Sequence, residues 1–138
     1  MLSASVCYSQ NGMKEKLRSI SEKIVFGEHS NIPEYMEYKT AEQKTFEEFS
    51  PWLKQTFNLD ESFGLKLLNQ ATDKLGYTHY RYQQTYQGIP LEGTMYLLHI
   101  KNNKVVSMNG LIYDKMDAAN SQILSEQLAL QNALKYTM

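Results

Sequence analysis

The sequence is poor in the residues that build cross-linked, membrane-embedded or nucleic-acid-binding proteins. It has one cysteine, Cys7, so no disulfide can form within the chain. It has no run of roughly 18 apolar residues, which excludes a transmembrane helix. Its 14 lysines and arginines are balanced by 15 acidic residues, which argues against a nucleic-acid partner. The remaining composition, 42% hydrophobic over 138 residues, predicts one globular domain.

Motifs for catalysis are also missing. The chain contains no HExxH zinc-protease motif, no GxSxG nucleophile and no phosphate-binding glycine loop. His79 and His99 are expected to be neighbours, but zinc needs three or four ligands, and the remaining histidine, His29, lies in a distant loop. Three scattered acids are interpreted as solvated positions: Glu47, Glu48 and Asp73. We therefore predict no catalytic residue, no metal site and no cofactor in this chain.

The first part of the chain predicts a short lead-in and a helix. Residues 1–12 are interpreted either as the remnant of a signal peptide or as a disordered N-terminus. Apolar residues at helical spacing then predict an amphipathic helix over 13–26, with Met13, Leu17, Ile20 and Ile24 on one face. The stretch EYMEYK alternates well enough for a short strand.

A second helix carries an aromatic stripe. Phe46, Phe49, Leu53 and Phe57 recur at steps of three and four, with Trp52 alongside. Pro51 is awkward inside such a helix, and Ser50–Pro51 is also readable as a cap and first residue at which the helix restarts.

The pattern then changes to strands. Residues 63–71, 77–87, 91–101 and 105–113 are predicted strands, joined by turns at TDKLG, Gly88–Pro90 and KNNK. The fold class is therefore α+β: a helix packed on a four-stranded antiparallel meander. After a polar linker, SEQLALQNALKYTM predicts a further C-terminal helix that begins a second unit within residues 117–138.

The strand THYRYQQTY carries two different faces, because residues two apart share a face. Tyr80, Tyr82 and Tyr86, with Gln84 among them, are expected to cover the aromatic helix. The other face carries His79, Arg81, Gln83 and Thr85. With Ile89 centring the reversal, His79 is expected opposite His99, Arg81 opposite Leu97, Tyr80 opposite Leu98 and Tyr82 opposite Tyr96.

The polar face is a candidate protein-binding surface, since it mixes charged, amide and apolar side chains. Arg81 is the leading contact residue, because a guanidinium forks two hydrogen bonds to a carboxylate. The expected contact residues are Arg81, Gln83, His79, Met95 and Leu97. An ordinary solvated face, with Arg81 bridging strands within the sheet, is the alternative interpretation.

GYTHYRYQQTYQGIPLEG followed by LLHIKNNKVVSMNG resembles the fungalysin/thermolysin propeptide (FTP) domain. The motif positions are His79, Arg81, Gln84, Gly88, Pro90, Glu92, Gly93, Ser107, Asn109 and Gly110. Scaffold roles are expected for Gln84, Tyr86, Gly88, Pro90, Glu92, Gly93, Asn109 and Gly110. The resemblance assigns residues 13–116 to an FTP-like domain and 117–138 to a linker and the first helix of an incomplete PepSY-like domain.

The resemblance implies an N-terminal prosegment, a folding assistant or inhibitor, of a secreted or cell-surface thermolysin-type zinc metallopeptidase. The expected partner is the peptidase domain, in cis or in trans, and zinc is expected only in that domain, which this sequence does not contain. The chain itself is expected not to be an enzyme.

Two other function classes remain open at the level of sequence. One is a free-standing secreted binding module, such as a cystatin-like inhibitor or an adhesin unit, because this type of fold hosts many functions. The other is a small-molecule carrier, for which the sequence shows no obvious pocket-forming pattern.

Overall fold

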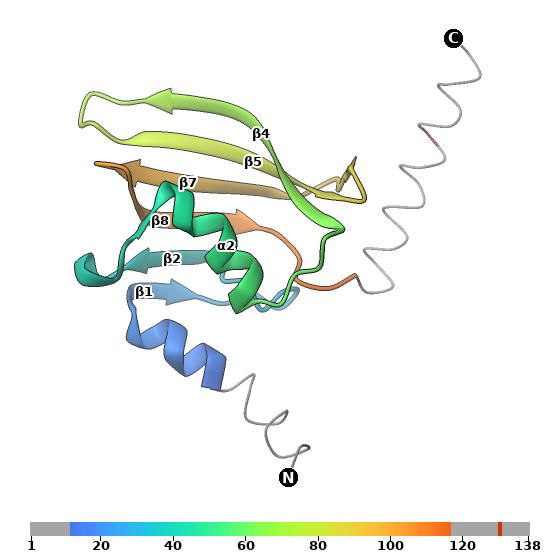
Figure 1. Cartoon of the computed structure of the whole chain (residues 1–138), viewed down its shortest axis with the longest axis horizontal. Coiled ribbons are helices and arrows are strands. Elements are labelled where there is room, and N and C mark those ends of the chain that lie inside the picture. Colours follow the sequence, from blue (N-terminus) through green and yellow to red (C-terminus); the bar gives the residue numbers. More distant parts are fainter. Residues whose placement is uncertain (1–11, 117–129, 131–138) are drawn as a thin grey trace.

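The computed structural model describes residues 12–116 and residue 130, and residues 12–116 form helices packed on a sheet (Figure 1). A first helix covers residues 12–19, and α2 is Phe46–Thr56. A short 3-10 turn, η1, is Thr40–Glu42. The strands are β1 Ser21–Val25, β2 Tyr35–Tyr38, β3 Lys44–Thr45, β4 Phe63–Thr72, β5 Thr78–Tyr86, β6 Ile89–Pro90, β7 Met95–Lys101 and β8 Lys104–Leu111. The predicted α+β class is confirmed.

Two expected segments fall outside this description. The lead-in at residues 1–11 and the C-terminal helix within 117–138, apart from Leu130, lie outside the described residues. Among the residues that are described, no helix is long and apolar enough to cross a membrane.

The sheet is antiparallel and larger than the predicted meander. Its strand order is β1-β2-β8-β7-β5-β4, so β4, β5, β7 and β8 are neighbours in chain order, as expected. The expected number of four strands is wrong, because β2 pairs with β8 and β1 pairs with β2, while β3 and β6 add short pairs. Met36 and Tyr38 of β2 are buried in the core. Because these alternating side chains are buried, β2 lies against the edge of β8. Without β2, the backbone groups along that edge of β8 would be unpaired.

The predicted helix over residues 13–26 is wrong in its second half. The helix ends at residue 19, and Ile24 and Val25 belong to strand β1. The Ser21 hydroxyl donates to the carbonyl of Leu17 at 2.6 Å, which satisfies one of the free carbonyls at the helix end. The β-branched residues that follow favour an extended backbone once a partner strand is available.

Helix α2 is continuous, so the restart at Ser50–Pro51 is also wrong. Thr45 caps it: the threonine hydroxyl accepts from the backbone N–H of Glu48 at 3.2 Å and donates to the Glu48 carboxylate at 2.8 Å. A threonine at the cap with a glutamate three residues later is the sequence of a capping box. Pro51 lies inside the helix, on its exposed side.

The aromatic stripe of α2 packs on the sheet, though not wholly on the tyrosines of β5. Phe49 and Leu53 are buried in the core with Tyr96 and Leu98, and Phe46 stacks on Tyr80 with ring centroids 4.7 Å apart. These contacts confirm most of the predicted interface.

Trp52 is the exception within the stripe. It is half-buried, and its ring meets Tyr38 of β2 edge-on at 5.6 Å and Phe57 at 6.1 Å. The indole therefore packs over a strand that the meander prediction lacked.

The chain reversal after β5 differs in detail from the expected one. The turn residues are Gln87 and Gly88, with φ of 52° and 80°, and Tyr86 pairs with Ile89 across a two-residue hairpin. Positive φ at both positions is typical of the two-residue turns that join twisted antiparallel strands. The KNNK turn is confirmed, since Asn102 and Asn103 have φ of 53° and 62°.

Two buried tyrosines give a test of the core. Burial raises the pKa of both Tyr38 and Tyr96, so both phenols stay protonated. The Tyr96 hydroxyl donates to the carbonyl of Pro33 at 2.9 Å, whereas the Tyr38 hydroxyl has no partner among the described residues.

We expect Tyr38→Phe to raise the free energy of unfolding by about 1 kcal/mol, since it removes a buried unsatisfied hydroxyl. Tyr96→Phe is the matched control and should lower it by about 1 kcal/mol, because it leaves the Pro33 carbonyl without its donor. Urea denaturation measures both. Shifts of the same sign in the two variants would contradict the assignment.

Candidate functional site: the outer face of the sheet

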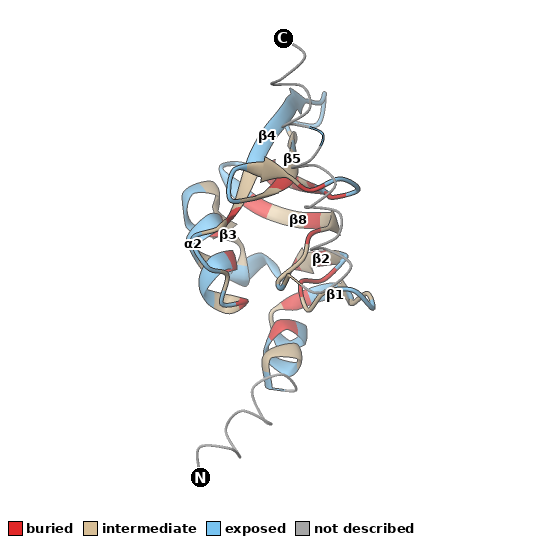
Figure 2. Ribbon diagram, turned by 90° about the vertical axis from the view of Figure 1, so that its right-hand side faces the viewer, coloured by how far each residue is buried: buried red, intermediate tan, exposed pale blue. Residues whose placement is uncertain are grey.

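The face of the sheet opposite α2 carries the candidate site. Figure 2 shows α2 to one side of β8 and β2. We call the opposite side the outer face. Within the described residues no helix covers it. By strand register its residues include Tyr35 and Glu37 of β2, Ser107 and Asn109 of β8, Met95, Leu97 and His99 of β7, and His79, Arg81 and Gln83 of β5.

Arg81 is an exposed cation of β5 on this face. It lies opposite Leu97 on β7 and Asn69 on β4, and its side chain is exposed. In the described part of the chain it has no ion pair and no side-chain hydrogen bond, so the strand-bridging alternative has no contact to support it. Met95, 40% exposed, and half-buried Leu97 place apolar surface on the same face.

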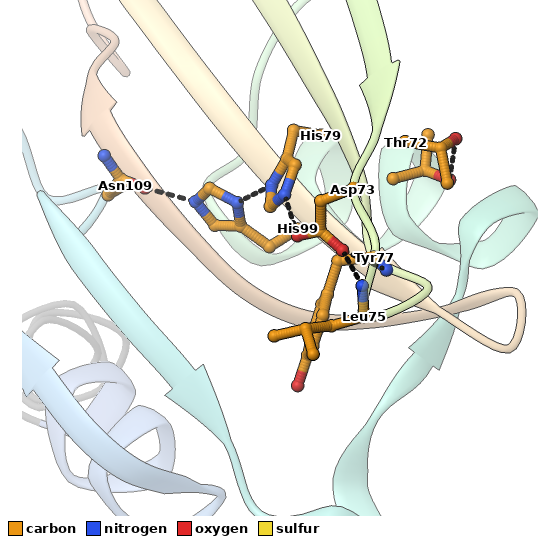
Figure 3. A network of polar contacts seen from close by, with 8 residues as sticks. Thr72, Asp73, Leu75, Tyr77, His79, His99 and Asn109 are labelled. Carbon is orange, nitrogen blue, oxygen red and sulfur yellow. Dashed lines mark hydrogen bonds and ion pairs between the residues drawn. The ribbon is translucent and has the colours of Figure 1, made fainter.

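His79 lies in a chain of side-chain hydrogen bonds across the outer face (Figure 3). Its Nδ1 is 2.6 Å from Nδ1 of His99, which confirms the predicted register. Its Nε2 is 2.8 Å from the Asp73 carboxylate, and Nε2 of His99 is 2.7 Å from Oδ1 of Asn109. We call Asp73, His79, His99 and Asn109 the histidine chain. Both ring nitrogens of His79 therefore already have partners within the molecule.

Asp73 is exposed, as expected of a solvated acid, but its carboxylate also has partners within the molecule. Its other oxygen accepts from the backbone N–H groups of Leu75 at 2.9 Å and Tyr77 at 3.1 Å, which shapes the β4–β5 turn. The hydrogen bond from His79, and then these backbone donors, hold the pKa of Asp73 below its usual range. The spacing Asp-x-x-Gly at a turn signals the backbone contacts. The contact to His79 needed the strand geometry.

The other two acids also have partners. The Glu48 carboxylate accepts a hydrogen bond from the hydroxyl of the capping Thr45 at 2.8 Å, and Glu47 accepts one from the Asn103 side chain at 3.1 Å. No group of three or more potential metal-ligating His, Cys, Asp or Glu residues was found in the part of the chain that the structure describes.

Gln83 and Gln84 are neighbours with opposite environments. Gln83, on the outer face, is half-buried and donates a long hydrogen bond of 3.3 Å to the Leu91 carbonyl. Gln84 is 1% exposed, and its amide pairs with both backbone groups of Tyr113: Nε2 donates to the carbonyl and Oε1 accepts from the N–H, each at 2.7 Å. The side chain of Gln84 therefore acts as a piece of strand backbone.

The remaining motif positions shape the backbone around this pair. Tyr86 meets Phe63 of β4 edge-on at 5.1 Å, and Pro90 lies in β6. Gly88 and Gly93 have positive φ of 80° and 83°, which only glycine adopts without strain.

Two further motif positions lie at the sheet's end. Glu92 is exposed in the loop that leads to β7. Gly110 has φ of 130°, and a Cβ built there would be 2.0 Å from the carbonyl oxygen of Met95. No larger residue fits this position without moving β7.

The structure also contains a cavity that the sequence did not signal. A space of about 430 Å³ opens between α2 and the strands, lined mainly by apolar residues such as Phe49, Leu53, Phe63 and Leu98. The sequence showed no pattern that predicts this cavity. Gln84, the amide in its wall, is already paired with Tyr113, and the other polar lining residues include Glu47, Ser50 and Lys54 of α2.

The two glutamines give a matched test of the scaffold. Gln84→Leu is expected to lower the free energy of unfolding by roughly 2–4 kcal/mol, because it leaves the part-buried N–H and carbonyl of Tyr113 without their partner. Gln83→Leu should change it by less than about 0.5 kcal/mol, as expected of a surface substitution. Thermal and urea unfolding measure both. Comparable destabilisation by the two changes would refute the distinction.

Comparisons with known proteins connect this scaffold to a family. Residues 63–111 match the family model described as the Fungalysin/Thermolysin Propeptide Motif, the stretch from the start of β4 to the end of β8. The chain is 33% identical over 102 residues to bacillolysin of Bacillus amyloliquefaciens, covering 72% of this chain and 20% of that protein. It is 29% identical over 100 residues to thermolysin of Alicyclobacillus acidocaldarius subsp. acidocaldarius, covering 71% of this chain and 16% of that protein. The chain therefore spans a fifth or less of the length of these relatives.

Proposed function

From the premise that this chain belongs to the fungalysin/thermolysin propeptide family, we propose that it is the prosegment of a thermolysin-type zinc metallopeptidase. In this role the chain binds the peptidase domain, assists its folding and holds it inactive. The chain does no catalysis itself. The observation that carries the proposal is the match over residues 63–111, which contains most of the strands that form the outer face.

The outer face is the docking surface in this proposal. Arg81 offers five N–H donors in a planar fork and has no partner for them among the described residues. A carboxylate of the peptidase domain matches that fork in charge and geometry. Met95 and Leu97 provide the apolar surface beside it.

Rigidity supports this use of the sheet. Arg81 lies on β5, which is hydrogen-bonded on both sides by β4 and β7. A side chain on a central strand is already positioned, so docking orders little additional backbone and loses little entropy. His79 contributes indirectly, through the histidine chain, and Gln83 borders the surface.

The expected setting follows from the same premise. We propose an extracytoplasmic location, a peptidase partner either in cis or in trans, and zinc bound only by that partner. Residues 117–138 are proposed to begin a PepSY-like unit.

A free-standing binding module is the competing proposal. Its outer face would bind a protein other than a thermolysin-type peptidase. Binding of the cognate peptidase domain distinguishes the two.

The main test is a binding titration of the chain with the cognate peptidase domain. We expect Arg81→Ala to weaken association by about 1.5–3 kcal/mol, the range for a hydrogen bond to a charged group. Arg81→Lys should recover little, because an ammonium group does not reproduce the planar fork. Both variants should keep the wild-type thermal stability, since Arg81 makes no side-chain contact of this kind within the described residues.

Lys54→Ala is the matched control. Lys54 is an exposed cation on α2, on the other side of the sheet, and its removal should leave affinity unchanged. Refolding yields of the peptidase domain with and without the chain measure the folding role. Unchanged affinity for Arg81→Ala, or no binding and no gain in refolding by the wild type, would overturn the proposal.

A further inference from the structure

The two histidine rings of the outer face meet nitrogen to nitrogen. The Nδ1 atoms of His79 and His99 are 2.6 Å apart, and the rings are nearly edge-on, with an interplanar angle of 71°. A contact this short between two nitrogens needs one hydrogen between them. One ring must donate and the other must accept through its lone pair.

The two ends of the histidine chain restrict where protons can reside. Nε2 of His79 faces the Asp73 carboxylate, which only accepts when ionised, so this nitrogen carries a hydrogen. Nε2 of His99 faces Oδ1 of Asn109, which also accepts, so this nitrogen carries a hydrogen too. With one more hydrogen between the Nδ1 atoms, the pair holds three ring protons and one positive charge, which faces the negative Asp73.

The chain also closes with one proton fewer. If the amide of Asn109 turns over, its N–H group donates to Nε2 of His99. His99 then donates from Nδ1 to His79, and His79 donates from Nε2 to Asp73. Both rings are neutral in this arrangement, and every hydrogen bond is kept.

A second additional proton has no place in the chain. Four ring protons put two N–H groups head to head across the 2.6 Å between the Nδ1 atoms, where neither has a lone pair to accept. The two imidazolium charges also repel each other. The two rings must then separate, which breaks the hydrogen bond between their Nδ1 atoms.

The surrounding charges reinforce this limit. Arg81 lies two residues along β5 from His79, and Lys101 lies beyond His99 on β7 with its ammonium 4.9 Å from the centre of the Tyr77 ring, which stacks on His79. These cations oppose a second proton on the pair. Among the described residues, the other charged or titratable groups on this face or in the β4–β5 turn include Lys74 in the turn, Lys66 on β4, Lys104 on β8, Lys23 on β1, and Tyr35 and Glu37 on β2.

Glu37, an acid of β2 on the same face, does not offset them. Glu37 is separated from His99 by Ser107 of β8, and it accepts a hydrogen bond from the Tyr35 hydroxyl at 3.2 Å. Asp73 is therefore the carboxylate in contact with the pair, and it is already used by the first proton.

We propose that the histidine chain is a proton-operated regulator of the docking face. It is closed when the pair carries one positive charge or none, and acid opens it by loading the second ring. This inference rests on the proposed docking function. Opening separates the two rings and adds a positive charge beside Arg81, so it changes both the shape and the charge of the surface that meets the peptidase.

The direction of the effect follows from proton counting. Acidification is the change that supplies a second proton to a pair of imidazole rings. The closed chain excludes that proton, whereas the two separated rings accept it. In this proposal the peptidase docks on the closed chain, whose shape the separated rings lose, so docking is favoured at neutral pH and weakened in acid, and release of the prosegment would accompany acidification.

The experiment uses two measurements on the full chain. In a nitrogen-isotope-labelled sample, through-hydrogen-bond coupling between Nδ1 of His79 and Nδ1 of His99 reports the central contact directly. We expect this coupling at about pH 7.5 and its loss at about pH 5. Affinity for the cognate peptidase domain is titrated at the same two pH values, and we expect it to fall at least about tenfold, the equivalent of roughly 1.4 kcal/mol.

Two variants separate the regulator from other titrations. His99→Gln leaves His79 without a second ring to face, so the change of affinity with pH should shrink to whatever the peptidase domain itself contributes. His29→Gln removes the remaining histidine, which is exposed in the loop between β1 and β2, and should behave as the wild type. Circular dichroism of both variants at neutral pH checks that they are folded.

Each outcome decides a different point. Absence of the coupling at neutral pH, or its persistence in acid, overturns the histidine chain as a proton-operated device whether or not the chain binds. Normal coupling with an affinity that does not change with pH, or that changes equally in His99→Gln, overturns the regulation. Normal coupling without any binding at neutral pH overturns the docking function, and the regulation with it.

Discussion

The hydrogen bonds of Gln84 hold together the part of the sheet on which the outer face depends. Its backbone N–H donates to the Thr94 hydroxyl at 3.2 Å, and its carbonyl accepts from the N–H of Leu91 at 2.8 Å. Its side chain pairs with both backbone groups of Tyr113 at 2.7 Å. One residue thus fixes the loop that follows the β5–β6 hairpin and the segment that follows β8.

That loop decides which side chains of β7 face outward. If the pairing of the two-residue hairpin had continued, Tyr82 would lie opposite Gly93, and it lies opposite Tyr96 instead. The difference is an odd number of residues, and an odd shift exchanges the two faces of a strand. Tyr96 and Leu98 therefore enter the core. Met95, Leu97 and His99 are left on the outer face.

The two faces of the sheet have different roles in the domain. The inner face is packed by α2 and supplies the burial that stabilises a small core. The outer face contributes little to that core, and its side chains are available for contact with a partner. Strands that are rigid because of their inner face also hold Arg81 and the histidine chain in place on the outer one.

The sequence by itself determined the elements with strong local signals. The alternation of β5, the asparagine turn and the aromatic spacing of α2 are local properties of the backbone and of side-chain periodicity, and they predicted the meander, its register and most of the helix contacts correctly. The motif residues around Gln84 and Gly93 also indicated the propeptide family, because their roles in turns and backbone pairing leave little freedom of residue type.

Only the tertiary structure decided the features that join segments far apart in the chain. Strand β1 has apolar spacing that fits a helix equally well, and pairing with β2 settles its conformation. Asp73 is an exposed acid, and its contact with His79 exists only because β5 brings the two together. Gln84 carries no local sign that its amide will pair with Tyr113. In each case the deciding contact is long-range, and its free energy outweighs a weak local preference once the strands are assembled.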